Sequence, residues 1–303
     1  MKATAQPLCQ APTVERDKSW FVVYADLFKA RLTFLVLLTT VVGFHVGFRG
    51  PLDYALLLHT LCGTALLAGG AAALNQYLER EWDAKMRRTQ TRPIPSGKLQ
   101  PETALLIGGL SAGAGLIYLA LAVNLLTSVL GAITLASYLF VYTPLKRMTH
   151  LNTVIGAIPG ALPPLMGWTA ARGEISIEGW SLFAILFFWQ LPHFLAIAWL
   201  YREEYAKAGF VMLPVIDPEG VRTGRQTVSH TLGLLSISLF PTFLGIAGVI
   251  YFFGALVLGL MFLGFAIQFS RGLTNARARQ LFLASILYLP LLLVLMVWDK
   301  VIH

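Results

Sequence analysis

The sequence predicts an all-α protein that crosses a membrane about nine times. Of its 303 residues, 56% are hydrophobic and 13% are charged, whereas soluble domains contain roughly 25% charged residues. The apolar residues also gather in runs of about 20, the length at which a helix spans the hydrocarbon core of a bilayer. A soluble core of this size could not bury so much apolar surface, so lipid must be the solvent for much of the chain.

Nine apolar runs are candidates for membrane-spanning helices. The divisions near residues 123 and 250 are the least distinct, because the links there are short and barely polar. The nine ranges are 30–48, 54–76, 102–122, 125–143, 153–171, 179–200, 229–249, 251–270 and 280–298.

The distribution of Lys and Arg predicts the same count independently. These residues collect in the cytoplasmic loops of membrane proteins. If the N-terminus is inside, 20 of the 23 lie in inside segments, and only Arg49, Arg172 and Lys300 fall outside. A wrong number of helices would scramble this division. It therefore predicts nine helices around a central cleft, with the N-terminus inside and the C-terminus outside.

The remaining organisation is simple. Residues 1–26 read as a polar cytoplasmic segment, and residues 27–303 as one transmembrane domain. The net charge of +8 follows from the basic inside loops, so no nucleic-acid partner is needed to explain it. Those loops can also attract anionic lipid or an anionic substrate.

An amide and two carboxylates are spaced for one helix face. If the second helix continues past its apolar run, Asn75, Glu79 and Asp83 lie at i, i+4 and i+8. Like charges at this spacing destabilise a bare helix, and a bound cation would remove that cost. Oxygen ligands of this kind suit Mg²⁺, which binds through one or two carboxylates together with substrate phosphates. A solvated helix end with salt bridges is the alternative interpretation.

Basic residues follow this cluster and the fourth helix. Arg88 and Arg92 are again four residues apart, and either could hold phosphates or pair with the acids. Lys146 and Arg147 come after Tyr142 at the end of the fourth run. They are either simple determinants of topology or groups that neutralise a leaving diphosphate.

A second acidic cluster follows the sixth helix on the same predicted membrane face. It contains Glu203 and Glu204, with Tyr205 and Lys207 close behind. An ordinary loop would explain it alone, but two acidic clusters on one face favour a shared site, because ionisable groups at the boundary of a membrane are usually functional.

The sixth helix itself contains Trp189, Gln190, Pro192 and His193. Proline interrupts the local hydrogen-bond ladder, and a histidine at membrane depth needs a partner. The interpretations are a hydrogen-bonded core histidine, a contact to a bound ligand, or a proton-transfer group.

Together these motifs resemble the intramembrane aromatic prenyltransferases of the UbiA superfamily, and within it the protoheme IX farnesyltransferase (heme O synthase) family. The resemblance covers nearly the whole chain from about Arg31. The matching residues are Asn75, Glu79 and Asp83; Met86, Arg88, Thr89, Arg92 and Pro93; Tyr142, Thr143, Lys146 and Arg147; Asn152, Thr153, Gly156, Gly160, Pro163, Pro164 and Gly167; Trp189, Pro192, His193 and Phe194; and Tyr201, Glu204, Tyr205, Gly209, Met212 and Pro214.

The resemblance implies transfer of a farnesyl group from farnesyl diphosphate to a vinyl group of heme b, with one or two Mg²⁺ ions. The implied metal ligands and catalytic groups are Asn75, Glu79, Asp83 and Glu204. The implied diphosphate donors are Arg88, Arg92, Lys146 and Arg147, and the implied heme contacts are His193, Trp189 and Gln190. Supporting roles fall to Tyr142, Tyr205, Lys207 and Glu203.

It also implies a setting: the inner membrane of a bacterium, with the active site toward the cytoplasm. The expected partners are farnesyl diphosphate, protoheme IX and the lipid bilayer. A heme A synthase or a terminal oxidase is the candidate recipient of the product.

Two other functions were weighed against this one. A prenyltransferase acting on a quinone-precursor ring would carry a second Asp-x-x-x-Asp motif, whereas this chain has Glu203, Glu204 and then Lys207. That departure leaves the number of metal ions open. A transporter or channel would have broken helices with charges at the midplane, whereas the acids here lie at one boundary.

Overall fold

Fourteen α-helices and one π-helix make up residues 19–301, which are the residues that the computed structural model describes. No β-strand occurs among them, so the prediction of an all-α fold is confirmed. The predicted polar segment 1–26 lies mostly outside the described residues, but its end forms an apolar helix, α1. The helices are α1 (Trp20–Leu27), α2 (Ala30–Gly47), α3 (Tyr54–Asp83), α4 (Pro101–Ala122), α5 (Leu125–Ala136), η1 (Ser137–Tyr142), α6 (Thr143–Leu145), α7 (Asn152–Arg172), α8 (Ile177–Leu200), α9 (Arg202–Lys207), α10 (Leu213–Ile216), α11 (Val221–Ser238), α12 (Phe240–Phe243), α13 (Val249–Gly272) and α14 (Asn275–Trp298).

Eight helices within residues 19–301 are long and apolar enough to cross a membrane. They are α2, α3, α4, the continuous run α5–η1–α6, α7, α8, α13 and α14. Their outward side chains are apolar: Leu121 of α4 is 83% exposed and Phe253 of α13 is 59% exposed. Apolar groups open to the surroundings on this scale need lipid around them, so the chain is an integral membrane protein.

The predicted seventh crossing, 229–249, is misplaced. The helix in this region, α11, begins at Val221 and ends at Ser238. Hydropathy misses its first half because Arg222, Arg225 and Gln226 are strongly polar. The hydroxyls of Thr227 and Thr231 are satisfied within the helix. Each hydroxyl donates to the carbonyl four residues earlier, at 2.8 Å, and the side chains are buried. The helix therefore packs against α8 and α13, although its sequence is less apolar than the others. Nine crossings and their orientation stay predictions.

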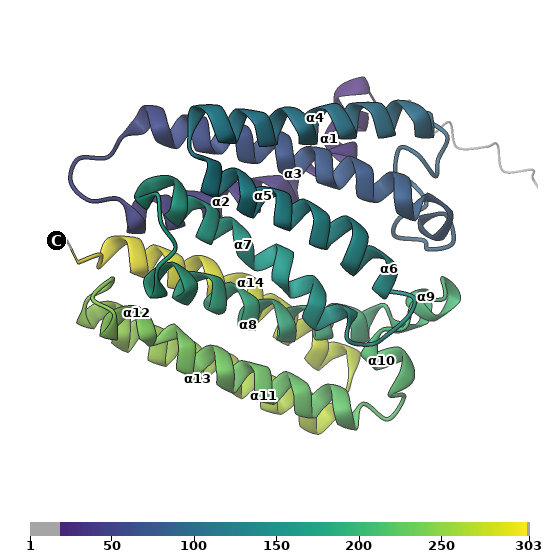
Figure 1. The fold of residues 1–303 in the computed structure, drawn as a ribbon. Helices are drawn as coiled ribbons and strands as arrows, with labels where there is room; N and C mark the ends of the chain where they lie inside the picture. The colour runs from purple at the N-terminus through teal and green to yellow at the C-terminus, as the bar shows by residue number, and fades with distance from the viewer. Residues whose placement is uncertain (1–18, 302–303) are drawn as a thin grey trace, which may run out of the picture.

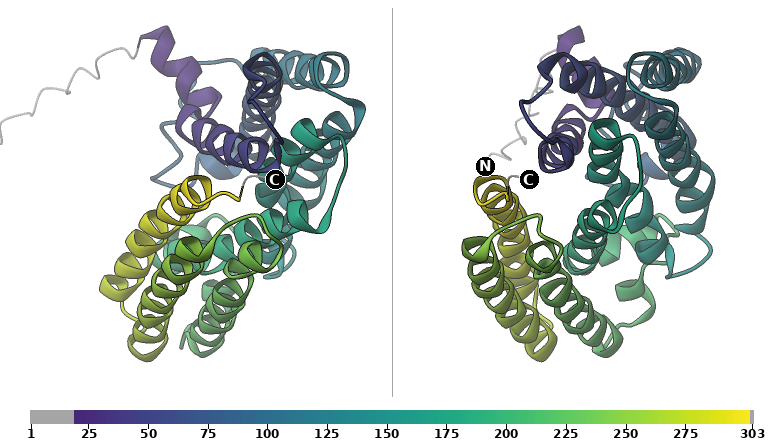
Figure 2. Two further views of the ribbon diagram at one scale, coloured as in Figure 1. Left: turned by 90° about the vertical axis from the view of Figure 1, so that its left-hand side faces the viewer. Right: turned by 60° about the vertical axis from the view of Figure 1, so that its left-hand side comes forward.

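The long helices run along one common direction, and loops gather at the two ends of the bundle (Figure 1). One apolar core lies among α8, α11, α13 and α14, and a second among α3, α4, α5 and α7. Helix α2 packs on α7 and also touches α14, so the first and last long helices are neighbours (Figure 2).

Small residues let α2 and α7 cross backbone to backbone. A methyl group on Gly43 would lie 2.0 Å from the carbonyl oxygen of Pro164, and one on Gly167 would lie 2.1 Å from that of Thr40. Both distances are far shorter than any van der Waals contact. Glycine is the common solution for such close approach between membrane helices, and this crossing fixes α7 as one wall of the site described next.

Candidate active site

The final turns of α3 carry the predicted amide and carboxylates. The helix continues seven residues past the predicted end of its apolar run and stops at Asp83, so Asn75, Glu79 and Asp83 do share one face. That face points inward: the three residues are only 1%, 5% and 1% exposed. Burial of two carboxylates is costly unless they are paired, and their partners are therefore informative.

Each of these three side chains is paired with a cation from another part of the chain. Lys29 Nζ donates to Asn75 Oδ1 at 2.8 Å. Lys146 Nζ pairs with Glu79 Oε1 at 2.6 Å, and Arg92 pairs with Asp83 Oδ2 at 2.5 Å. The sequence left open whether the basic residues pair with the acids. In the structure they do, and the three cations come from three separate segments of the chain.

The surroundings act in opposite directions on the two lysines. Burial, reinforced by the nearby charge of Arg92, lowers the pKa of Lys29 to about 7. Burial acts most strongly on Lys146 and would lower its pKa, but the adjoining Glu79 carboxylate together with Tyr142 and Tyr138 raises that pKa above its ordinary value. Lys146 is therefore a permanent cation, held by Glu79.

A cavity of about 470 Å³ lies beside these pairs. Along α3 it extends from Asp83 to Thr64, about 28 Å at the rise of an α-helix. The polar lining residues are Lys29, Thr33, Thr64, Asn75, Glu79, Asp83, Arg88, Arg92, Thr134, Tyr138, Tyr142, Lys146, Gln190 and Tyr205. The apolar lining residues include Leu32, Val36, Leu67, Leu135, Pro163, Met166, Phe194 and Ile197. Charged groups therefore occupy one end, and the deeper walls are mostly apolar, with the hydroxyls of Thr64 and Thr134 among them.

A π-helical turn, η1, shapes one wall of the polar end. Such turns occur often at functional sites. Here it presents the rings of Tyr138 and Tyr142, stacked with centroids 5.9 Å apart, and Lys146 Nζ lies 4.6 Å from the centre of the Tyr142 ring. Gly156 leaves room for that ring, because a methyl group there would lie 2.4 Å from it.

The second acidic cluster reaches the rim of the site through one residue. Glu204 Oε2 accepts from the backbone N–H of Arg88 at 3.4 Å, and the Arg88 side chain donates to the Tyr205 hydroxyl at 3.3 Å. Glu204 itself does not line the cavity and touches it only through Arg88, which does. Glu203 and Lys207 are exposed and do not line it.

Arg147 also points away from the cavity. Its guanidinium lies 4.3 Å from the centre of the Trp82 ring, whereas its neighbour Lys146 turns inward to Glu79. Both residues lie in the turn that follows α6, and only Lys146 lines the cavity.

Two of the three predicted heme contacts face α14. Gln190 lines the cavity, and its amide donates to the carbonyls of Leu186 and Ala157. Trp189 instead donates from Nε1 to Ser285 O at 2.8 Å, and His193 lies beside it at a ring distance of 4.9 Å. The three implied heme contacts therefore do not line one cavity, because adjacent residues of a helix are about 100° apart and neither Trp189 nor His193 lines the cavity.

The tautomer of His193 follows from its partner. Ser285 Oγ donates its one proton to Phe282 O at 2.6 Å, so it can only accept at its 2.7 Å contact with His193 Nδ1. The proton is therefore on Nδ1, and Nε2 keeps its lone pair.

Sequence reasoning missed Lys29 and Tyr138 as site residues. Lys29 was assigned only to topology, yet it lies at the left-handed residue (φ 46°) between α1 and α2, which turns its side chain to Asn75. Tyr138 lies four residues before Tyr142, a spacing that could have suggested a shared wall.

The donor set suits Mg²⁺ of the substrate-bridging kind. Residues 19–301 contain no group of three or more His, Cys, Asp and Glu side chains that could hold a metal, because the third oxygen donor beside Glu79 and Asp83 is the amide of Asn75. Magnesium completes its shell with water and phosphate oxygens rather than with an all-protein cage. Two buried carboxylates and an amide that face one cavity fit that requirement.

Comparison with known proteins identifies the family. The family model of the UbiA prenyltransferase family matches residues 36–291. The chain belongs to this family. This UbiA-family member is 49% identical over 286 residues to the protoheme IX farnesyltransferase of Solibacter usitatus. The aligned region covers 91% of this chain and 98% of the relative. The protoheme IX farnesyltransferase of Myxococcus xanthus is 43% identical, with 99% of both chains covered.

Solved structures share the UbiA fold at low sequence identity. A digeranylgeranylglyceryl phosphate synthase superposes with a TM-score of 0.78 at 15% identity, over 92% of this chain and 98% of the other. A UbiA homologue from Archaeoglobus fulgidus bound to GPP and Mg²⁺ has a TM-score of 0.64 at 17% identity, over 90% and 99%. These likenesses establish the architecture.

Proposed function

We propose that this protein transfers the farnesyl group of farnesyl diphosphate to a vinyl group of protoheme IX and so makes heme O. The observation that carries the proposal is the cavity that joins two buried carboxylates and four cations to an apolar interior. A substrate with an anionic head and a C15 tail matches both parts. The names of the Solibacter and Myxococcus relatives supply the acceptor.

Asn75, Glu79 and Asp83 would hold one Mg²⁺, and Glu204 at the rim is the candidate for a second ion. The bound metal would neutralise the diphosphate oxygens and stabilise the charge that develops on them. The GPP and Mg²⁺ in the Archaeoglobus homologue support this assignment. Farnesyl diphosphate would place its head here and its tail toward Leu67.

The basic residues then have a defined task. Arg88, Arg92 and Lys146 would donate to the diphosphate as it leaves, in a site where low dielectric strengthens each contact. Arg147 is outside this set because its guanidinium lies over Trp82. Lys29 is a further candidate donor to the diphosphate, because its amine lies in the cavity beside Asn75.

The chemistry breaks the C1–O bond of the farnesyl chain, and the electron pair leaves with the diphosphate. The heme vinyl group then forms the new C–C bond, and water adds to the resulting cation and loses a proton. Apolar walls keep water from the first, allylic cation. The ring faces of Tyr138 and Tyr142 lie next to the polar end, where they can stabilise such a cation.

The porphyrin would contact α8. Gln190 is the contact inside the cavity, and His193 with Trp189 extends the surface toward α14. The Nδ1–H···Ser285 hydrogen bond orients the His193 ring and leaves Nε2 available for iron, the usual arrangement for a ligating histidine. Ser285 is then a positioning residue.

The bacterial relatives support a location in a bacterial inner membrane, and the distribution of Lys and Arg supports an orientation with the polar end of the cavity toward the cytoplasm. The product would pass to a heme A synthase or a terminal oxidase.

A single assay tests the reaction. Membranes containing the protein receive heme b, farnesyl diphosphate and Mg²⁺, and extracted hemes are analysed by mass spectrometry. We expect heme b to gain one farnesyl group and one hydroxyl group. No farnesylated heme, together with prenylation of 4-hydroxybenzoate, would replace this proposal with the quinone-precursor reaction.

The heme contact has a separate optical test. We expect His193→Ala to shift the Soret band of the heme complex and to weaken heme binding, while Phe282→Leu beside it retains the wild-type band. A Soret band that is unchanged in His193→Ala would remove this histidine from the iron.

A further inference from the structure

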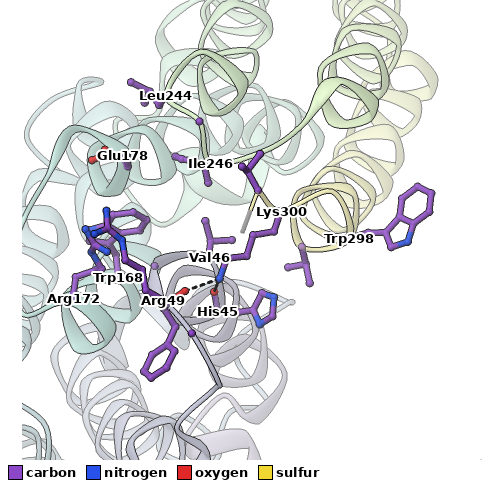
Figure 3. Close-up of a pocket in the computed structure, with 16 residues that line it drawn as sticks. His45, Val46, Arg49, Trp168, Arg172, Glu178, Leu244, Ile246, Trp298 and Lys300 are labelled. Carbon is purple, nitrogen blue, oxygen red and sulfur yellow. Dashed lines mark hydrogen bonds between the residues drawn. The ribbon is translucent and has the colours of Figure 1, made fainter. Parts of the chain in front are cut away.

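A second cavity, of about 390 Å³, lies at the end of the bundle opposite Asp83. It is formed by the ends of α2, α7, α8 and α14 and by the turn at 244–246 (Figure 3). It shares no lining residue with the cavity described above. We call it the outer cavity, because the charge distribution predicts that this end faces outward.

The outer cavity collects the basic residues of its membrane face. Arg49, Arg172 and Lys300 all line it, and they are the three cations that the topology places outside. Outer loops are normally poor in Lys and Arg, so three in one cavity require a local reason. The imidazole of His45 also lines the cavity, whereas Glu178 is the one carboxylate among the lining residues.

These cations are only partly neutralised by the protein. Arg172 pairs at 3.4 Å with Glu174, whose side chain is 61% exposed. Arg49 forms no salt bridge within residues 19–301. Lys300 Nζ donates to the carbonyls of His45 and Phe48 at 2.6 and 2.7 Å (Figure 3). An ammonium group has three donors, so one N–H of Lys300 is still available.

The distance to His193 excludes the proposed heme as the source of an anion. Glu178 and His193 are 15 residues apart on α8, about 22 Å along the helix. The propionates of a porphyrin centred at His193 cannot extend that far. The anion must therefore come from a different molecule.

The surroundings favour a lipid over a small soluble anion. Trp168 and Trp298 line the cavity, and tryptophan gathers where the headgroups of a membrane begin. Trp298 is 72% exposed, and Val46, Val297 and Leu244 line the same space. An anionic phospholipid presents a phosphate beside hydrocarbon, which matches cations that adjoin an apolar, lipid-facing surface.

We propose that the outer cavity binds the phosphate of an anionic phospholipid, with Arg49, Arg172 and the remaining N–H of Lys300 as donors. A lipid phosphate bound there would contact residues at the ends of α2 and α7 and in the segment after α14. Lys300 already ties that segment to the end of α2, so the lipid reinforces the contact between the first and last long helices.

Native mass spectrometry and thermal unfolding in detergent test this proposal, with cardiolipin, phosphatidylglycerol, phosphatidylcholine or inorganic phosphate added. We expect the anionic lipids to be retained and to raise the melting temperature. In Arg49→Gln/Arg172→Gln, retention should weaken about thirtyfold, because each basic residue at an anionic membrane surface contributes roughly a fivefold preference. Arg49→Gln alone, which breaks no salt bridge, should weaken it about fivefold.

The matched control is Arg222→Gln, an exposed arginine at the start of α11, which should retain the lipid like the wild type. Equal loss in Arg222→Gln would mean nonspecific attraction and overturn the site. Equal retention of phosphatidylcholine would overturn the role of charge, and equal stabilisation by inorganic phosphate would overturn the lipid as the source. Each result can be distinguished from failure of the heme reaction, because none requires turnover.

Discussion

At the scale of single residues, the polar end of the large cavity is a set of matched charges. Lys146 neutralises Glu79, and Arg92 neutralises Asp83. When a divalent cation and a diphosphate bind, each of these side chains would exchange its present partner for a ligand. The carboxylates would bind the metal, and the basic groups would bind the phosphates. The arrangement therefore keeps buried charges paired both without and with substrate.

Asp83→Asn should abolish turnover while the protein still inserts in the membrane. The substitution keeps the size of the side chain and removes the negative charge proposed to hold Mg²⁺. We expect kcat to fall at least about 100-fold, as when one strong electrostatic contact to a transition state is lost. Heme O formation by mass spectrometry measures it.

The control for Asp83 is on the same helix. Glu81→Gln changes a carboxylate whose side chain is 70% exposed and should leave kcat within about twofold of the wild type. Near-normal activity in Asp83→Asn would exclude this carboxylate from the site.

Lys146→Gln should lower stability as well as activity. It leaves Glu79 buried without its cation, and losing one partner of a buried pair costs about 3 kcal/mol. Thermal unfolding measures the loss. The double variant Lys146→Gln/Glu79→Gln should recover most of it, since both charges are then absent. A double variant that is less stable than either single one would contradict the pairing.

At the scale of helices, the crossing of α2 and α7 holds the cavity wall in place. Gly43→Ala puts a methyl group against the Pro164 carbonyl, and overpacking of this kind costs about 1–3 kcal/mol. We expect a lower melting temperature. Gly113→Ala on α4 is the control, because nothing lies within 4 Å of the added methyl group and alanine favours a helix over glycine. Equal melting temperatures for the two variants would refute the close crossing.

The helices also show what the sequence could predict. Apolar runs and the i, i+4, i+8 spacing predicted eight of the long helices and the buried face of Asn75, Glu79 and Asp83. Hydropathy placed the start of α11 too late, because Arg222, Arg225 and Gln226 make its first turns polar although the helix packs against α8 and α13. The sequence also could not predict that Trp189 and His193 face α14 while Gln190 faces the cavity. The direction of each side chain depends on which helix packs against each side of α8.

At the scale of the whole molecule, the helix bundle places its two cavities at opposite ends. The charged groups near Asp83 lie at one end, apolar walls continue inward, and the outer cavity lies at the other end. An amphiphilic substrate can enter such a bundle in one orientation only, head toward the carboxylates. The proposed contacts to the acceptor both come from α8, where Gln190 faces the cavity and His193 faces α14.

The cavity beside Asp83 is proposed as the metal–diphosphate site. A crystal structure with Mn²⁺ and an unreactive farnesyl diphosphate analogue tests this assignment, because anomalous scattering locates the metal. We expect Mn²⁺ bound to oxygens of Asn75, Glu79 and Asp83, with Lys146 and Arg92 moved onto the diphosphate. Metal and diphosphate located elsewhere, with both salt bridges intact, would contradict it.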